Sequence, residues 1–115
     1  MENLKNGKCE ACRKDESGAT SDEIAAAQSQ IPDWKVLEVD GEPRLQREYS
    51  FADFQEALDF TNRVGTIAEA ENHHPAITTE YGKVTVGWWT HTIKNIHRSD
   101  LIMAAKTDEL YQAKS

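Results

Sequence analysis

Two hairpin patterns, one in each half of the chain, constrain the fold most strongly. In each, two short runs that mix apolar and polar residues flank a turn-forming sequence. They comprise residues 34–39 and 45–51 around Asp40-Gly41-Glu42-Pro43, and residues 76–81 and 84–90 around Gly82-Lys83. Trp88 and Trp89 fall on opposite faces of the last strand, so only one of them can lie in a covered core. Two such hairpins can pair into one four-stranded antiparallel sheet.

Helical patterns precede, separate and follow the hairpins. The first begins at Thr20 or Ser21, which can cap a helix, and ends before Pro32. The second spans about residues 51–70, can start at Ser50 or Asp53, and has its apolar residues at helical spacing. These residues are Phe54, Leu58, Val64, Ile67 and Ala68. The third runs over about residues 99–112 with Ser99 as its cap. The order α-β-β-α-β-β-α predicts a two-layer α+β fold with three helices on one face of the sheet.

Length and charge limit the classes of protein that fit. A chain of 115 residues is enough for one domain, which we place at residues 20–115 after a flexible arm at residues 1–19. The net charge of −7 disfavours direct contact with nucleic acid or an anionic membrane. No apolar run approaches the ~20 residues of a membrane span, and the N-terminus lacks the apolar core of a signal peptide. A cytoplasmic protein is expected.

The two cysteines, Cys9 and Cys12, lie in the predicted arm with two residues between them. A zinc site needs four ligands, and no second Cys or His pair lies nearby in the arm. A thioredoxin-type motif should follow a strand, and no strand pattern precedes this one. A reduced cysteine pair is therefore expected, with a metal or redox role as the alternative.

Three of the four histidines bracket the second hairpin. His73 and His74 follow the long helix, and His91 follows the last strand. Because the intervening strands run out and back, these imidazoles and Asp100 can meet at one end of the sheet. Histidine can take and give protons near neutral pH, and a carboxylate such as Asp100 or Glu69 can fix its tautomer.

Other interpretations of these histidines remain open. Each can be an exposed or capping residue, and His97, in a charged loop, is predicted to lie on the surface. Three histidines can also hold a catalytic zinc ion. A protein-binding module or coactivator is the non-enzymatic alternative.

The combined pattern resembles the pterin-4a-carbinolamine dehydratase family over roughly residues 20–112. The resemblance rests on Glu69, His73-His74-Pro75, Tyr81, Thr90-His91 and Asp100, together with Trp34 and the Phe54-Gln55-Glu56-Ala57 segment. It implies the same α+β fold, joined into homodimers or homotetramers. It also implies dehydration of 4a-hydroxytetrahydrobiopterin, or a related pterin, to quinonoid dihydropterin without a metal or other cofactor. Some relatives act as dimerisation cofactors of a transcription factor.

The resemblance also assigns roles. His73, His74 and His91 are the expected catalytic residues, with His73 and His91 as the principal acid and base. His74 would position the substrate or serve as a second base. Glu69, Thr90 and Asp100 are the expected substrate-binding residues, and Asp100 can instead orient His91. The pterin would be a substrate in the recycling of the cofactor of aromatic amino acid hydroxylases.

Overall fold

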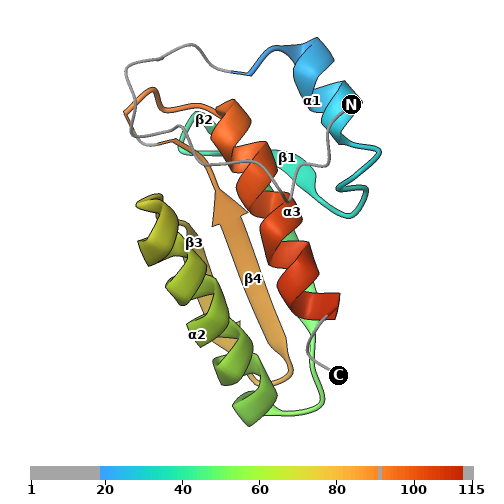
Figure 1. Cartoon of the computed structure of the whole chain (residues 1–115), viewed down its shortest axis with the longest axis vertical. Helices are drawn as coiled ribbons and strands as arrows, with labels where there is room; N and C mark the ends of the chain where they lie inside the picture. The colour runs from blue at the N-terminus through green and yellow to red at the C-terminus, as the bar shows by residue number, and fades with distance from the viewer. Residues whose placement is uncertain (1–18, 91, 113–115) are drawn as a thin grey trace.

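The computed structural model describes residues 19–90 and 92–112. Its three helices and four strands follow the predicted order α-β-β-α-β-β-α, which confirms the α+β fold class (Figure 1). They are α1 (Ser21–Ala27), β1 (Lys35–Val39), β2 (Glu42–Ser50), α2 (Phe54–Glu71), β3 (Ala76–Glu80), β4 (Lys83–Trp88) and α3 (Arg98–Gln112). The predicted cysteine pair and arm fall outside the described residues.

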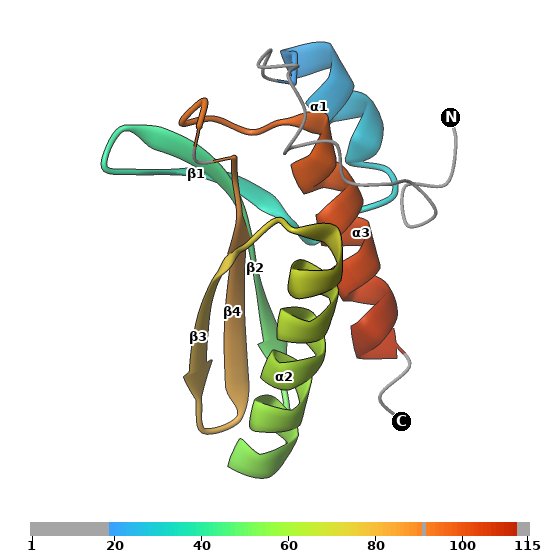
Figure 2. The same ribbon diagram turned by 60° about the vertical axis from the view of Figure 1, so that its left-hand side comes forward.

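The four strands form one antiparallel sheet in the order β1-β2-β4-β3. The two hairpins therefore meet through β2 and β4, where Leu45 lies opposite Trp88. All three helices lie on one side of this sheet, and the β1–β2 hairpin extends beyond them (Figure 2). None of the helices in the described part has the length and apolar character needed to cross a membrane.

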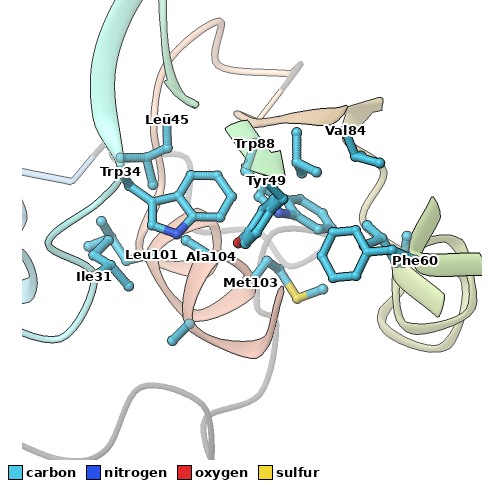
Figure 3. Close-up of a cluster of buried hydrophobic side chains, with 14 of the residues drawn as sticks. Ile31, Trp34, Leu45, Tyr49, Phe60, Val84, Trp88, Leu101, Met103 and Ala104 are labelled. Atoms are coloured by element: carbon cyan, nitrogen blue, oxygen red, sulfur yellow. The ribbon is translucent and has the colours of Figure 1, made fainter. Parts of the chain in front are cut away.

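The core lies between the sheet and the helices, as Figure 3 shows. Alternation along the strands directs one set of side chains from β2 and β4 toward α2 and α3. This set contains Leu45, Tyr49, Val84, Val86 and Trp88, all of which are buried. Trp34 completes the aromatic part of the core and packs edge-to-face with Tyr49. Trp89 lies on the opposite face of the sheet, where the guanidinium of Arg44 stacks 3.7 Å from its ring centroid.

The predicted apolar face of α2 is partly wrong. Its buried residues are Ala57, Phe60, Val64 and Ala68. Phe54 and Leu58, which were expected on the apolar face, are 45% and 36% exposed. The helix begins at Phe54, and the Asp53 carboxylate caps it by accepting the Glu56 N–H at 2.9 Å.

Several element ends also differ from the expectation. Pro43, predicted in the turn, belongs to β2 and lies opposite Glu38. Its missing N–H is tolerated there because β2 pairs with β4 only from Leu45 onward. The first helix ends at Ala27, well before Pro32.

A capping box starts α1 and links it to α3. Thr20 accepts the Glu23 N–H, and the Glu23 carboxylate accepts the Thr20 N–H. The other Glu23 oxygen lies 2.6 Å from Nε of Arg98, the first residue of α3. The Thr20 N–H and then Arg98 lower the pKa of Glu23 below its ordinary value.

A partly buried polar cluster joins the far part of α3 to the sheet. Oδ1 of Asp108 accepts hydrogen bonds from Trp34 Nε1 (3.0 Å), Arg47 Nη1 (2.7 Å) and Tyr49 OH (2.5 Å). Burial, and then the charge of Asp108, raise the pKa of Tyr49 far above its ordinary value, so the phenol stays protonated and donates. These bonds fix the orientation of α3 on the sheet.

Candidate active site

The α2 C-terminus directs two adjacent histidines to different environments. Asn72 has a positive φ of 54° and ends the helix in the left-handed conformation. Its N–H bonds the Glu69 carbonyl at 3.3 Å, and the His73 N–H bonds the Ala68 carbonyl at 3.1 Å. After this turn His73 is buried, whereas the side chain of His74 is 53% exposed.

The buried histidine meets Asp100 from the first turn of α3. His73 Nε2 lies 2.5 Å from Asp100 Oδ1, and Asp100 has no exposed surface. The other carboxylate oxygen, Oδ2, accepts the Thr90 hydroxyl at 2.9 Å and the His97 main-chain N–H at 2.8 Å. The ends of α2 and β4 and the start of α3 thus come together (Figure 1).

These contacts select one tautomer of His73. Asp100 accepts two hydrogen bonds at Oδ2, and an ionised carboxylate has no hydrogen to donate from Oδ1. His73 Nε2 is therefore the donor in the contact with Oδ1 and carries the hydrogen. The lone pair of the neutral ring is then on Nδ1. The ring also stacks on Trp88, with centroids 5.5 Å apart and planes 25° apart. Both contacts hold Nδ1 in one direction, as a general base requires.

The prediction that His97 lies on the surface is wrong. This side chain is 2% exposed, and its Nδ1 accepts the Ser99 N–H at 3.1 Å. His97, rather than Ser99, therefore caps α3, which begins at Arg98. Capping statistics favour small oxygen-bearing residues, so the sequence carried no clear signal for an imidazole in this position.

A second imidazole–carboxylate pair lies at the surface. His74 Nε2 is 2.5 Å from Glu69 Oε2, and both side chains are mostly exposed. The five-residue separation is bridged because Asn72 reverses the chain after the helix. This pair can bind the polar edge of a small molecule or exchange a proton with it.

The predicted site is therefore assembled in part. His73, Thr90 and Asp100 come together in the buried cluster, and Glu69 pairs with His74. His91 lies outside the described residues, so the convergence of three histidines stays a prediction. Tyr81, which belongs to the family pattern, is 76% exposed. Within residues 19–90 and 92–112, no group of three or more His, Cys, Asp and Glu side chains is arranged to hold a metal ion.

The fold and the site define a class: a small α+β protein with a histidine–carboxylate cluster suited to proton transfer. Comparison with known sequences gives the family. Residues 17–110 match the family model described as pterin 4 alpha carbinolamine dehydratase. A Syntrophotalea carbinolica protein named, provisionally, as a pterin-4-alpha-carbinolamine dehydratase is 60% identical over 112 residues, covering 97% of this chain and 100% of the relative. A Nitrosococcus oceani protein with the same provisional name is 54% identical over 110 residues, covering 96% and 97%. The chain belongs to this family.

Solved structures show the same fold. A Brucella melitensis protein described as a transcriptional coactivator/pterin dehydratase matches with a TM-score of 0.72 and 29% identity, covering 82% of this chain and 98% of that one. A pterin dehydratase-like protein described as a RuBisCO assembly factor in the alpha-carboxysome matches with a TM-score of 0.58. Its 19% identity over 69% of this chain and 89% of that one supports the fold alone.

Proposed function

We propose that this protein dehydrates a 4a-hydroxytetrahydropterin to the quinonoid dihydropterin by histidine acid–base catalysis. One observation carries the proposal: His73 Nε2 lies 2.5 Å from Asp100 Oδ1, and from this contact we infer a proton on Nε2 and a lone pair on Nδ1. Family membership supplies the substrate class. The proposed substrate would be formed by an aromatic amino acid hydroxylase in the cytoplasm.

The reaction needs one base and one acid. In the proposed step, a base removes the proton from N5 of the pterin, and the electron pair that remains forms the N5–C4a double bond. The C4a–O bond breaks at the same time, and the hydroxyl leaves as water after it receives a proton. His73 Nδ1 is the base in this scheme, and Asp100 stabilises the imidazolium that forms.

The other residues divide the remaining tasks. His91 is the proposed acid for the leaving hydroxyl. The exposed His74–Glu69 pair is the proposed contact to the polar edge of the pterin, with His74 also available as a second base. The buried Thr90 hydroxyl donates a hydrogen bond to Asp100. We therefore assign Thr90 to support of this carboxylate rather than to a hydrogen bond with the substrate.

The test is the dehydration rate of freshly generated 4a-hydroxytetrahydrobiopterin, followed by ultraviolet absorbance with wild type and His73→Ala. We expect His73→Ala to lower turnover by about 10²–10⁴-fold. Each protein is also assayed after chelator treatment, because the alternative of a three-histidine metal enzyme requires loss of the wild-type rate. No acceleration by folded wild type would refute the proposed function.

A coactivator role is the second candidate, and the description of the Brucella melitensis protein favours it. It predicts a stable complex with a transcription factor that is retained when His73 is replaced by Ala. Pull-down of wild type and variant with the same purified partner separates this role from catalysis.

We also propose that the protein is a homodimer or homotetramer. β1 pairs only with the Glu42–Gln46 part of β2, so within the described residues Arg47–Ser50 have a strand neighbour on one side only. An open strand edge of this kind favours pairing with a second copy. Sedimentation velocity tests this, and a monomer at all concentrations would refute it.

A further inference from the structure

The start of α3 contains a titratable residue that the proposed reaction does not use. His97 is among the largest fully buried side chains of the domain. It lies three residues before Asp100, and it was expected at the surface. Its main-chain N–H and its carbonyl both bond Asp100, the residue that fixes His73.

The geometry at this helix end is a reciprocal cap. The His97 side chain accepts the N–H of Ser99, the second helical residue, through Nδ1 at 3.1 Å. In return, Asp100 at the third helical position accepts the main-chain N–H of His97 through Oδ2 at 2.8 Å. This arrangement resembles a capping box in which an imidazole replaces the usual hydroxyl and accepts the N–H of the second helical residue instead of the third. The Asp100 N–H closes the first turn on the His97 carbonyl at 2.9 Å.

We infer that His97 is a positioning residue of the proposed active site: it caps α3 and so holds Asp100 in the orientation that fixes His73. Asp100 connects the two sets of contacts, because Oδ2 belongs to the cap and Oδ1 to His73. If the side-chain cap is lost, the first turn of α3 can fray, and the carboxylate then rotates away from His73. The inference rests on the proposed function for its kinetic readout only.

The imidazole has two separable properties: its Nδ1 acceptor and its volume. His97→Asn keeps a capping acceptor, because Asn is a preferred N-cap residue. His97→Leu keeps similar volume but has no acceptor. If positioning is the role, the two variants differ in catalysis even where their stabilities are similar.

Asp53→Ala is the matched control for loss of a helix cap. Asp53 caps α2 through the Glu56 N–H at 2.9 Å, at the opposite end of that helix from His73. Its loss removes a cap of comparable kind without touching Asp100. If lower stability alone reduced kcat, Asp53→Ala and His97→Leu would lose kcat equally.

The experiment measures kcat and KM for dehydration and melting temperature for all three variants. We expect His97→Leu to lower kcat on the order of 10- to 100-fold with KM changed by less than about threefold, since a displacement near 1 Å is enough for such a loss. His97→Asn and Asp53→Ala keep kcat within about threefold of wild type. If His97→Leu does not fold, His97→Gln replaces it as the variant with a poor cap and retained volume.

Proton NMR gives a readout that does not depend on turnover. The Nε2 proton shared by His73 and Asp100 should shift or broaden in His97→Leu and stay unchanged in His97→Asn. If the wild type is inactive but the NMR signal changes in His97→Leu and not in His97→Asn, the proposed function is refuted and the positioning role is retained. If the wild type is active, any of three results refutes the positioning role: His97→Leu keeps kcat, both His97 variants lose kcat equally, or Asp53→Ala loses as much kcat as His97→Leu.

Discussion

Replacement of Asp100 by Asn is the sharpest test of how the site fixes its base. The variant keeps the size of the side chain, and its amide oxygen can still accept Thr90 and the main chain of His97. The amide nitrogen then faces His73 Nε2 and can only donate to it. The proton of the neutral imidazole moves to Nδ1, which removes the lone pair that the proposed reaction uses.

The structure allows an estimate of the size of this effect. The wrong tautomer removes general-base catalysis, which contributes about 10²–10⁴-fold in rate, or about 2.7–5.5 kcal/mol in activation free energy. KM should change little, because Asp100 is fully buried and makes its contacts to the protein. Two of its three hydrogen bonds are retained, so the melting temperature should fall only modestly.

Asp108→Asn is the matched control, on the same helix. Asp108 also accepts three hydrogen bonds, but from Trp34, Arg47 and Tyr49, which lie away from the histidines. We expect this variant to lose about 2–4 kcal/mol of stability, because Arg47 loses its closest charged partner. Its kcat should stay near that of wild type.

The assay follows quinonoid dihydropterin formation by ultraviolet absorbance after rapid mixing, with chemical denaturation of each variant in parallel. The expected result is opposite in the two variants: Asp100→Asn loses rate and keeps stability, and Asp108→Asn loses stability and keeps rate. Retention of kcat within about threefold in Asp100→Asn would refute the tautomer argument. An equal loss of kcat in both variants would show that the loss is not specific to the contact between Asp100 and His73.

Three further predictions concern stability. Asn72→Gly should be neutral or slightly stabilising by denaturant titration and Asn72→Val should cost about 1–3 kcal/mol, because residue 72 has a left-handed backbone with φ of 54°; equal effects would contradict this. Because the pKa of Glu23 is lowered in the folded state, Glu23 stabilises the fold at pH values above its ordinary pKa of 4.5. This stabilisation is lost as pH falls through the lower pKa of the folded state. The difference in melting temperature between wild type and Glu23→Gln should therefore shrink as pH falls below 4.5, and it should be small throughout because Glu23 is partly exposed. The pKa of Tyr49 is raised, so stability should fall as pH rises above the ordinary value of 10.0. Tyr49→Phe should make this alkaline slope shallower by up to about 1.4 kcal/mol per pH unit in denaturation at several pH values, and an unchanged slope would contradict the assignment.

The order of elements was predictable because turn and cap signals are local. Thr20 with Glu23 three residues later marks the start of α1, and Gly82 between two apolar runs marks the second hairpin. The buried face of α2 was harder to predict. Phe54 and Leu58 are larger than Ala57, so they dominate an apolar pattern, but the sheet packs against the smaller residue. Size alone does not tell which face of a helix meets its sheet.

The site could be predicted in its members but not in its contacts. The spacing around the second hairpin placed His73 and Asp100 at one end of the sheet, and the family resemblance added Thr90. The structure brings these three residues into hydrogen-bond contact. The spacing did not show that His73 would be buried and His74 exposed, because that difference depends on the left-handed turn at Asn72. It also missed His97, since burial of a polar residue depends on a main-chain donor, here Ser99, that only the folded helix end supplies.

The position of Asp100 explains why the cluster can be ready before substrate arrives. A buried carboxylate is costly unless donors satisfy it, and three are supplied by parts of the fold that are needed anyway: the end of β4, the cap of α3 and the turn after α2. The helix N-terminus adds a favourable field for the negative charge. Because these groups are fixed by folding, little reorganisation is needed when His73 becomes charged during proton transfer. The hydrogen bond from the His97 main chain that starts α3 therefore also helps to set the electrostatics of the proposed base.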